Sequence, residues 1–213
     1  MQIVWHGLSC FEVTSKTPDG DVTLVLDPYA PETGLKLPRS LSADLVAATH
    51  GGEDAHHVEA VEGEPFLIDM PGEFEAKGVF VFGIHAPLQK GSRDHRIFCV
   101  EQEGLRLVHL GALDRPLTDE ELQQLGQVDI LMVPVGGGRV LSPKAASEVI
   151  SQVEPRVVIP MSHQLPGLKE EAAGVESFCK ELGVCRREEG TKYKVTRRDL
   201  PEEDMLVMTL QRG

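Results

Sequence analysis

The chain has 213 residues, of which 41% are hydrophobic and 26% charged, the composition of an ordinary globular domain. Its formal net charge is −13, from 21 Lys and Arg against 34 Asp and Glu, and this surplus argues against binding to nucleic-acid backbones or anionic membranes. No apolar run approaches the roughly 18 residues that a membrane-spanning helix needs. No signal peptide is expected before the first strand, so we expect a cytoplasmic protein.

The first half of the chain is rich in short stretches of β-forming residues. The pattern predicts strands at 2–6, 9–15 and 21–27, and the acid Asp27 before Pro28 closes the last of these. Further strands are predicted at 43–49, 66–69, 79–84, 96–101 and 105–110.

The second half alternates strands with helices. A capping box with Thr118 as N-cap and Glu121 three residues later predicts a helix start. Ser142 caps, and Pro143 opens, a second helix. A third helix is expected over 169–182, and strands are expected at 128–135, 156–160, 192–196 and 205–210. Periodicity alone therefore predicts an α/β or α+β protein, with one domain over 1–213.

Two compositional features bear on environment and partners. The cysteines Cys10, Cys99, Cys179 and Cys185 show no CxxC spacing, so free thiols, as is usual in the cytosol, are expected. Basic residues gather between 186 and 198. They form either a nucleic-acid patch or the solvated face of an edge strand, where Lys and Arg oppose aggregation, and we favour the second interpretation.

The segment 45–57 carries the strongest chemical signal. An apolar strand ends in Thr49-His50, and Gly-Gly-Glu-Asp-Ala-His-His follows. In the pattern Thr/Ser-His-x-His-x-Asp-His, imidazoles and a carboxylate converge on zinc from one short turn. His50 and Asp54 match two positions of this pattern, whereas Gly52 and Ala55 fill the other two and cannot coordinate a metal.

Further motifs accompany this loop along nearly the whole chain. They are Trp5-His6-Gly7-Leu8-Ser9-Cys10-Phe11, Leu26-Asp27-Pro28, Pro71-Gly72-Glu73-Phe74-Glu75, His109-Leu110-Gly111, Val133-Pro134-Val135-Gly136-Gly137 and Ile159-Pro160-Met161. Together they resemble the metallo-β-lactamase superfamily, in the branch of Zn-dependent hydrolases that includes the ascorbate-6-phosphate lactonase-like proteins. This resemblance implies a four-layer αββα sandwich with a metal site at one rim, where loops from both sheets meet.

The same resemblance implies that the metal site is degenerate. Of the expected ligands, His50 and Asp54 remain in one loop. Non-ligating residues replace a histidine in the first motif, two histidines in the main loop, the aspartate that bridges two metals and a histidine after Met161. These residues are Leu8, Gly52, Ala55, Ala112 and Ser162.

Displaced side chains offer a route to a rebuilt site with one metal. His163 follows Ser162, His56 and His57 lie next to the lost ligand position Ala55, and Asp114 lies two residues after Ala112. A catalytic zinc needs about three protein ligands, which these residues could supply with His50 and Asp54. In such a site Asp54 could act as ligand or general base. The alternatives are structural: His50 is a hydrogen-bonded histidine at the rim, and Asp54 is a helix cap. The rings of His56 and His57 are then exposed to solvent. His109 and Asp27 are also interpreted as structural.

A run of glycines provides a candidate anion site. Gly136, Gly137 and Gly138 precede a predicted helix, and their backbone N–H groups could bind an anionic substrate group. A tight turn is the alternative explanation.

Two functional hypotheses follow. In the favoured one, the two-metal hydrolytic centre is largely lost and the protein, without a cofactor, is a non-catalytic or divergent homologue serving as a binding or structural module. In the alternative, it is a hydrolase of a lactone, ester or phosphodiester with one zinc or other divalent cation. The partners expected are a small anionic ligand, a second copy of the chain or an active homologue.

Overall fold

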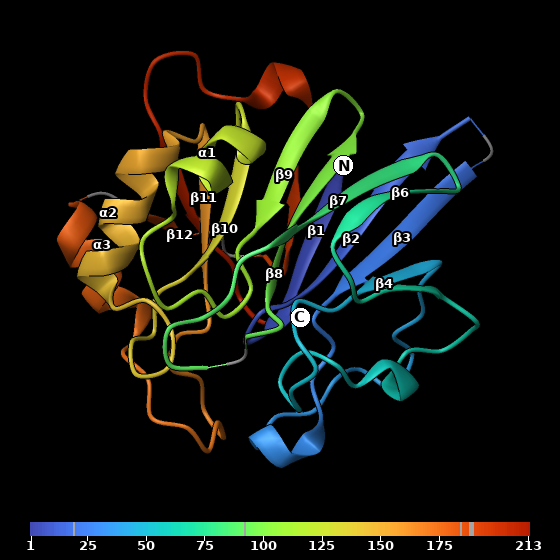
Figure 1. Ribbon diagram of the computed structural model, residues 1–213, viewed down its shortest axis with the longest axis horizontal. Helices are drawn as coiled ribbons and strands as arrows, with labels where there is room; N and C mark the ends of the chain where they lie inside the picture. The colour runs from blue at the N-terminus through green and yellow to red at the C-terminus, as the bar shows by residue number, and fades with distance from the viewer. Residues whose placement is uncertain (19, 92, 184, 188–189) are drawn as a thin grey trace.

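Two β-sheets packed face to face occupy the centre of the computed structural model, which describes residues 1–18, 20–91, 93–183, 185–187 and 190–213 (Figure 1). In spatial order, the first sheet contains β13 (Lys192–Lys194), β1 (Gln2–Gly7), β2 (Cys10–Thr17), β3 (Gly20–Leu26), β4 (Leu45–Ala47) and β5 (Phe66–Ile68). The second contains β12 (Arg186–Arg187), β14 (Leu206–Thr209), β11 (Val157–Met161), β10 (Ile130–Pro134), β9 (Leu105–His109), β8 (Arg96–Gln102), β7 (Val79–His85) and β6 (Gly72–Ala76).

Each sheet combines an antiparallel meander with parallel strands. Strands β1 to β3 and β6 to β9 are antiparallel neighbours, whereas β3, β4 and β5, and β9, β10, β11 and β14, run parallel. Parallel neighbours need crossover connections, and those of the second sheet carry α1 (Asp119–Leu125), α2 (Pro143–Val153) and α3 (Val175–Leu182). The mixed α/β class predicted from the sequence is confirmed.

The helix starts that local chemistry predicts are confirmed. The hydroxyl of Thr118 accepts a hydrogen bond from the Glu121 N–H, and the Glu121 carboxylate accepts one from the Thr118 N–H, which completes the capping box. Ser142 Oγ accepts from the Ala145 N–H at the start of α2. The predicted start of the third helix at residue 169 is wrong, because α3 begins after its N-cap Gly174. The preceding backbone is bound elsewhere, for example through the Lys169 N–H to the Thr33 carbonyl.

Strands β10 and β11 bury both of their faces. From β10, Ile130 and Met132 pack into the core between the two sheets, while Leu131 and Val133 pack under the helices. Each such side chain contributes about 1.5–3 kcal/mol through its burial. The nearly continuous run of β-forming residues in this segment reflects its two apolar neighbours.

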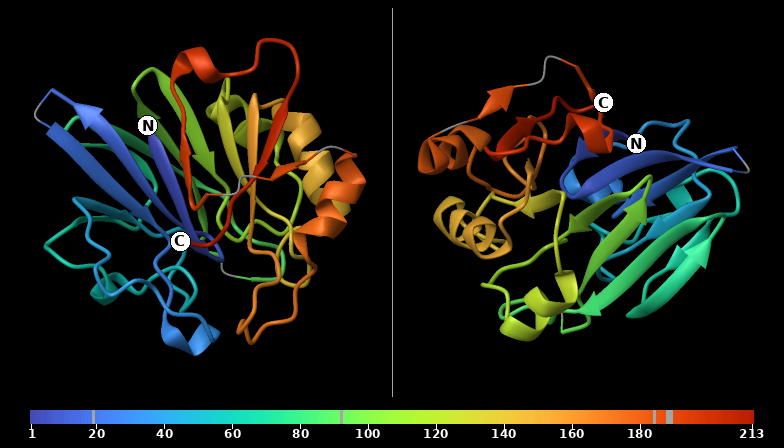
Figure 2. Two further views of the ribbon diagram at one scale, coloured as in Figure 1. Left: turned by 180° about the vertical axis from the view of Figure 1, so that it is seen from behind. Right: turned by 90° about the horizontal axis from the view of Figure 1, so that it is seen from above.

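The two outer layers differ. All three helices cover the second sheet (Figure 2). The outer face of the first sheet is covered by loops through Tyr29, Leu35, Leu41 and Val61, with the 3-10 turns η1 (Pro31–Thr33) and η2 (Val58–Ala60). Within the described residues, the fourth layer of the expected αββα sandwich therefore consists of loops and 3-10 turns.

The cysteines are divided between two environments. Cys10 and Cys99 are free and buried, but Cys179 and Cys185 form a disulfide, with Cα atoms 5.4 Å apart. The expectation of free thiols is wrong for this pair, because Cys179 in the last turn of α3 and Cys185 beyond its C-cap Gly183 lie within bonding distance. Among the described residues, none of the helices has the length and apolar character that crossing a membrane would require.

Loops from both sheets meet at one rim, at the lower edge of Figure 1. His109, at the end of β9, donates from Nε2 to the Ser9 carbonyl in the turn between β1 and β2, at 2.8 Å. After β11, the Ser162 N–H donates to the Leu8 carbonyl at 3.0 Å. These bonds tie the ends of the second sheet to the first, and they place the motif-bearing loops side by side.

Candidate functional site

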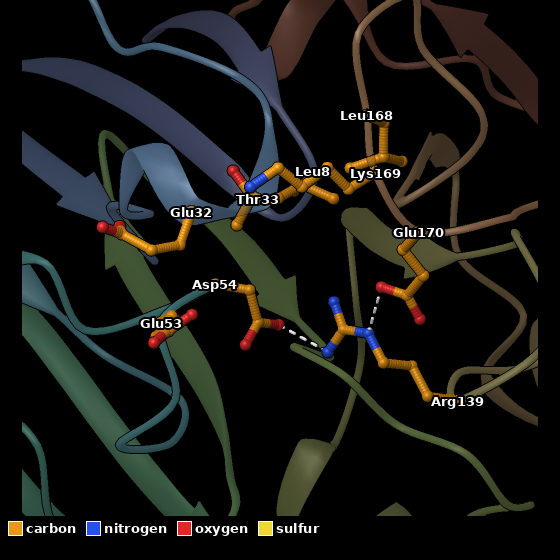
Figure 3. Close-up of a pocket in the computed structure, with 9 residues that line it drawn as sticks. All are labelled: Leu8, Glu32, Thr33, Glu53, Asp54, Arg139, Leu168, Lys169 and Glu170. Carbon is orange, nitrogen blue, oxygen red and sulfur yellow. Dashed lines mark hydrogen bonds and ion pairs between the residues drawn. The ribbon is translucent and has the colours of Figure 1, made fainter.

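A pocket of about 370 Å³ opens at this rim (Figure 3). Its walls come from the turn after β1, η1 and the loops that follow β4, β10 and β11. Most of its lining is charged, with carboxylates on the side of the first sheet and an arginine reaching across from the second. The lining residues are Leu8, Glu32, Thr33, Glu53, Asp54, Arg139, Leu168, Lys169 and Glu170.

The loop after β4 is held by Asp27. This carboxylate is fully buried and accepts hydrogen bonds from the Thr49 N–H at 2.7 Å and the Thr49 hydroxyl at 2.8 Å. Burial raises the pKa of Asp27, although the nearby His109 and His50 oppose this shift. The structural interpretation of Asp27 agrees with this geometry, which fixes the chain at the point where His50 leaves the strand.

His50 faces Asp54 across the turn. Its Nδ1 accepts a hydrogen bond from the Gly52 N–H at 3.1 Å, so Nε2 is the atom directed at the carboxylate. Nε2 lies 3.5 Å from Asp54 Oδ2 and, within the described residues, is buried without a hydrogen-bond partner. Burial alone would lower the pKa of His50, but the Asp54 carboxylate outweighs it, and the net shift is upward.

Asp54 is bound by an arginine from the other sheet. Arg139 Nη1 donates to Asp54 Oδ2 at 2.5 Å, and Arg139 Nε donates to Glu170 Oε2 at 2.5 Å (Figure 3). Burial would raise the pKa of Asp54, but His50 and Arg139 together hold it well below its usual value. The guanidinium thereby joins three loops of the rim. No helix begins near Ala55, so Asp54 is not a helix cap; the next element is η2, whose N-cap is His57.

The other candidate ligands point to different partners. His163 packs against Trp5 in a tilted arrangement with ring centroids 4.7 Å apart, and its Nδ1 lies 3.2 Å from the Gln164 carbonyl oxygen. His56 pairs with Asp69 at 3.6 Å. The Nδ1 atom of His57 lies 3.4 Å from the Tyr29 carbonyl oxygen. Of the five candidate metal ligands, the structure therefore brings together His50 and Asp54.

Displaced Asp114 and the buried histidines are occupied by the backbone. Asp114 accepts hydrogen bonds from the N–H groups of Gln89 and Lys90. His95 donates from Nδ1 to a carbonyl and accepts the Ala112 N–H at Nε2, so it connects two loops as a neutral ring. Burial lowers the pKa of both His95 and His109. These groups have structural partners and stand apart from the pocket lining.

The glycine run forms a turn beside Arg139. Gly137 and Gly138 have φ angles of 73° and 66°, and the Gly137 N–H donates to the Leu141 carbonyl at 2.9 Å. A Cβ on Gly136 would lie 2.1 Å from the Ser162 carbonyl oxygen, so only glycine allows the two loops to approach this closely. The tight-turn role is evident, and at least one of the three N–H groups is already used inside the protein.

The donor set of this rim falls short of a zinc site. Within the residues that the structure describes, no group of three or more His, Cys, Asp or Glu side chains is arranged to hold a metal ion. Zinc sites use three or four protein ligands. His50 and Asp54 supply two, and the carboxylate is already bound to a guanidinium. These residues therefore do not fit the two-metal centre that the intact motif forms in the superfamily pattern.

The sequence motifs did not indicate the two pocket residues that bind each other, nor Lys169 beside them. Arg139 and Glu170 lie in loops without a recognisable motif, and Arg139 is 85 positions from the carboxylate that it binds. The only local signal was the preceding glycine turn, which marks a close approach of backbone segments.

The two facing sheets, with helices on the second and a charged pocket where their loops meet, define a metallo-β-lactamase-fold domain. The family model described as "Beta-lactamase superfamily domain" matches residues 2–162, and the chain belongs to this superfamily.

Some relatives of the chain carry hydrolase names. The chain is 28% identical over 208 residues to a UPF0173 metal-dependent hydrolase of Anaeromyxobacter sp. (strain K), covering 75% of this chain and 73% of the relative. It is 27% identical over 209 residues to a UPF0173 protein of Pyrococcus abyssi, covering 85% and 90%. A crystal structure from Thermotoga maritima, provisionally named a Zn-dependent hydrolase of the metallo-beta-lactamase superfamily, superposes with a TM-score of 0.81 at 31% identity over 99% of this chain and 100% of that one.

Proposed function

We propose that this member of the superfamily has lost the two-metal hydrolytic centre and serves as a binding module whose rim pocket holds a small anionic ligand. The observation that carries this proposal is the ion pair between Arg139 and Asp54. A metal-dependent hydrolase uses its cations to generate hydroxide and to polarise the scissile bond. A guanidinium provides neither a bound water of low pKa nor an open coordination position. The pocket can therefore still bind an anionic ligand, but it cannot hydrolyse a substrate by the metal-dependent route.

The anionic ligand is inferred from the free part of the same side chain. Nε and Nη1 of Arg139 are bound to carboxylates, and Figure 3 shows the remaining nitrogen directed toward the side of the pocket where Leu8 and Thr33 lie. Lys169 adds a second cation to the lining. A compact oxyanion, such as a phosphate or carboxylate group, suits this pair of donors.

Zinc stoichiometry tests the loss of the metal centre. The protein is incubated with excess zinc chloride, passed through a desalting column and measured by plasma emission spectroscopy. We expect well under one zinc per chain. Two zinc ions per chain would overturn the proposal.

Inorganic phosphate serves as the probe anion for the pocket. Its binding should raise the Tm of the protein, and an unchanged Tm at saturating phosphate would exclude an anionic ligand in this pocket.

The second candidate is a metal-dependent hydrolase of a lactone, ester or phosphodiester with a rearranged site for one metal. The names of the relatives support this candidate more directly than the first. The buried Nε2 of His50, which has no hydrogen-bond partner among the described residues, would bind the cation after giving up its proton, since Nδ1 already accepts the Gly52 N–H. With zinc added, substrates of the three classes would be hydrolysed by the wild type, and His50→Ala would lose both turnover and bound zinc. A variant that keeps both would exclude this candidate.

The remaining expectations are also part of the proposal. A single domain over residues 1–213 should resist limited proteolysis as one fragment. A homodimer or a complex with an active homologue would be seen by light scattering and co-purification. A cytoplasmic location is tested by fractionation of cells that express the protein.

A further inference from the structure

Arg139 is the only side chain of the pocket lining that, within the described residues, is ion-paired to two other lining residues. It contacts Asp54 from the loop after β4 and Glu170 from the loop after β11, each at 2.5 Å, and Arg139 itself comes from the loop after β10. Its side chain is 37% exposed, while that of Asp54 is 17% exposed. One cation thus pairs with two carboxylates and links loops that belong to both sheets.

Three of the lost ligand positions lie close to this arginine or to the residue that follows it. Leu8 and Ser162, which stand where the superfamily pattern has histidines, line the same small hollow as Arg139. Ala112, which replaces the bridging aspartate, packs in an apolar cluster with Val140, the residue after the arginine. At two of the lost ligand positions, neutral side chains therefore line a hollow into which the chain itself supplies a positive charge.

We propose that Arg139 is a built-in cation that takes over the structural task of the metal ion, an inference that rests on the proposed loss of the two-metal centre. It pairs with Asp54 and Glu170, offsets part of their negative charge and holds the rim loops together. An arginine suits this task because its planar guanidinium stays charged and can donate to two carboxylates at once. It also opposes metal binding, because a divalent cation near Asp54 would lie close to another positive charge.

This assignment predicts a gain of metal binding when the arginine is removed. In Arg139→Gln, the carboxylates of Asp54 and Glu170 lose their cation while His50 still faces Asp54. Oxygen and imidazole donors without a neutralising partner attract a divalent cation. We expect zinc affinity, measured by calorimetric titration with zinc chloride, to rise at least about tenfold over wild type, the scale of one modest charge interaction.

Three further variants serve as controls for the zinc titration. Lys169→Gln removes the same charge from the same pocket, but Lys169 makes no ion pair within the described residues, so its zinc affinity should remain that of wild type. Arg139→Gln combined with Asp54→Asn should return zinc affinity to the wild-type level. If Arg139→Gln does not fold, as judged by circular dichroism, Arg139→Met is used instead. It removes the same charge while an unbranched apolar side chain occupies the place of the arginine stem, and it should raise zinc affinity by a similar factor.

Hydrogen exchange supplies a readout without metal. In Arg139→Gln, peptides from 50–57 and 165–174 should exchange faster than in wild type, while peptides from β10 should not change. Equal zinc affinity in wild type and Arg139→Gln, or unchanged exchange of both loops, would overturn the inference.

The outcomes also separate this inference from the proposed function. Stoichiometric zinc in wild type, with still tighter binding in Arg139→Gln, would reject the loss of the metal centre but retain the antagonism between arginine and metal. No zinc in either protein would reject the inference and leave the proposed function intact.

Discussion

The buried carboxylate of Asp27 accepts two hydrogen bonds from Thr49, one from the backbone N–H and one from the hydroxyl. This contact joins the end of β3 to the end of β4, next to the first residue of the candidate site. Asp27→Ala leaves both donors buried without partners, and we expect a loss of about 2 kcal/mol or more in the free energy of unfolding. Thr49→Val removes one of the two bonds and should cost about 1 kcal/mol. Urea denaturation measures both, and an Asp27→Ala effect no larger than that of Thr49→Val would contradict the role of the backbone contact.

The pair of Arg115 and Glu121 supports the start of α1. The two side chains are 10% and 7% exposed, and the carboxylate accepts hydrogen bonds from both terminal nitrogens of the guanidinium and from the Thr118 N–H. Burial would raise the pKa of Glu121, yet Arg115 and Thr118 lower it. Glu121→Ala should cost about 3 kcal/mol, because it leaves a buried guanidinium unpaired. Thr118→Ala removes only a cap and should cost about 1 kcal/mol. If Glu121→Ala and Thr118→Ala lose similar amounts of unfolding free energy, the guanidinium of Arg115 is hydrated by water once Glu121 is removed.

The capping box at α1 could be predicted from the sequence, whereas the ion pair of Arg139 and Asp54 could not. Thr118 and Glu121 lie three positions apart, so the two hydrogen bonds of the capping box depend on local chain geometry and were predictable. The strand pattern was predictable for the same reason, and so was the fold, from the order of its motifs. The ion pair of Arg139 and Asp54 depends on how two sheets are stacked. No local rule brings residues 85 positions apart into contact.

The same reason accounts for the wrong helix start at residue 169. The segment before α3 has residues that are compatible with a helix, but its backbone bonds to other loops. The Lys169 N–H donates to the Thr33 carbonyl, and Glu170 binds Arg139. Tertiary contacts at the rim therefore override local preference where the candidate site is built.

Two buried histidines predict a loss of stability below neutral pH. Burial, which penalises the charged ring, lowers the pKa of His95 to about 3, and it lowers the pKa of His109 as well. In the unfolded chain these rings take up protons near pH 6.5, whereas His95 in the folded protein does so only near pH 3. The unfolded state therefore binds more protons in this window, and the free energy of unfolding falls as the pH falls, by up to about 1.4 kcal/mol per pH unit for each ring.

His95→Gln retains a donor and an acceptor but removes one of the two titrating rings. We expect a shallower fall in unfolding free energy between neutral pH and pH 4.5 than in wild type, measured by urea titrations at each pH. Ile97→Val is the matched control, because it removes one buried methylene group at a cost of about 1 kcal/mol and shifts the whole curve without changing its slope. A His95→Gln curve parallel to that of wild type would show that the ring is protonated in the folded state.

The disulfide between Cys179 and Cys185 predicts a response to reductant. It closes a short loop between the end of α3 and β12. Under oxidising conditions, alkylation of the native protein should label no thiol of this pair, and mass spectrometry after reduction should show two labels on the corresponding peptides. Cys179→Ser should lower the free energy of unfolding by about 2 kcal/mol, the entropy expected for a loop of this size. Full labelling without reductant would contradict the bond.

Gly136 and Gly137 separate two effects of the glycine turn. In Gly136→Ala, the new Cβ would lie 2.1 Å from the Ser162 carbonyl oxygen, so the loops after β10 and β11 must move apart, at a cost of about 3 kcal/mol. In Gly137→Ala, the nearest atom to the new Cβ is 3.9 Å away, and the cost is the left-handed backbone conformation alone, about 1 kcal/mol. Urea denaturation should therefore rank Gly136→Ala well below Gly137→Ala in stability.

The Ser162 N–H also donates a hydrogen bond to the Leu8 carbonyl. Gly136→Ala should therefore also loosen the turn between β1 and β2 and reduce the phosphate-induced rise in Tm. If both variants lose the same free energy, backbone conformation rather than contact between the loops explains why glycine is needed at residue 136.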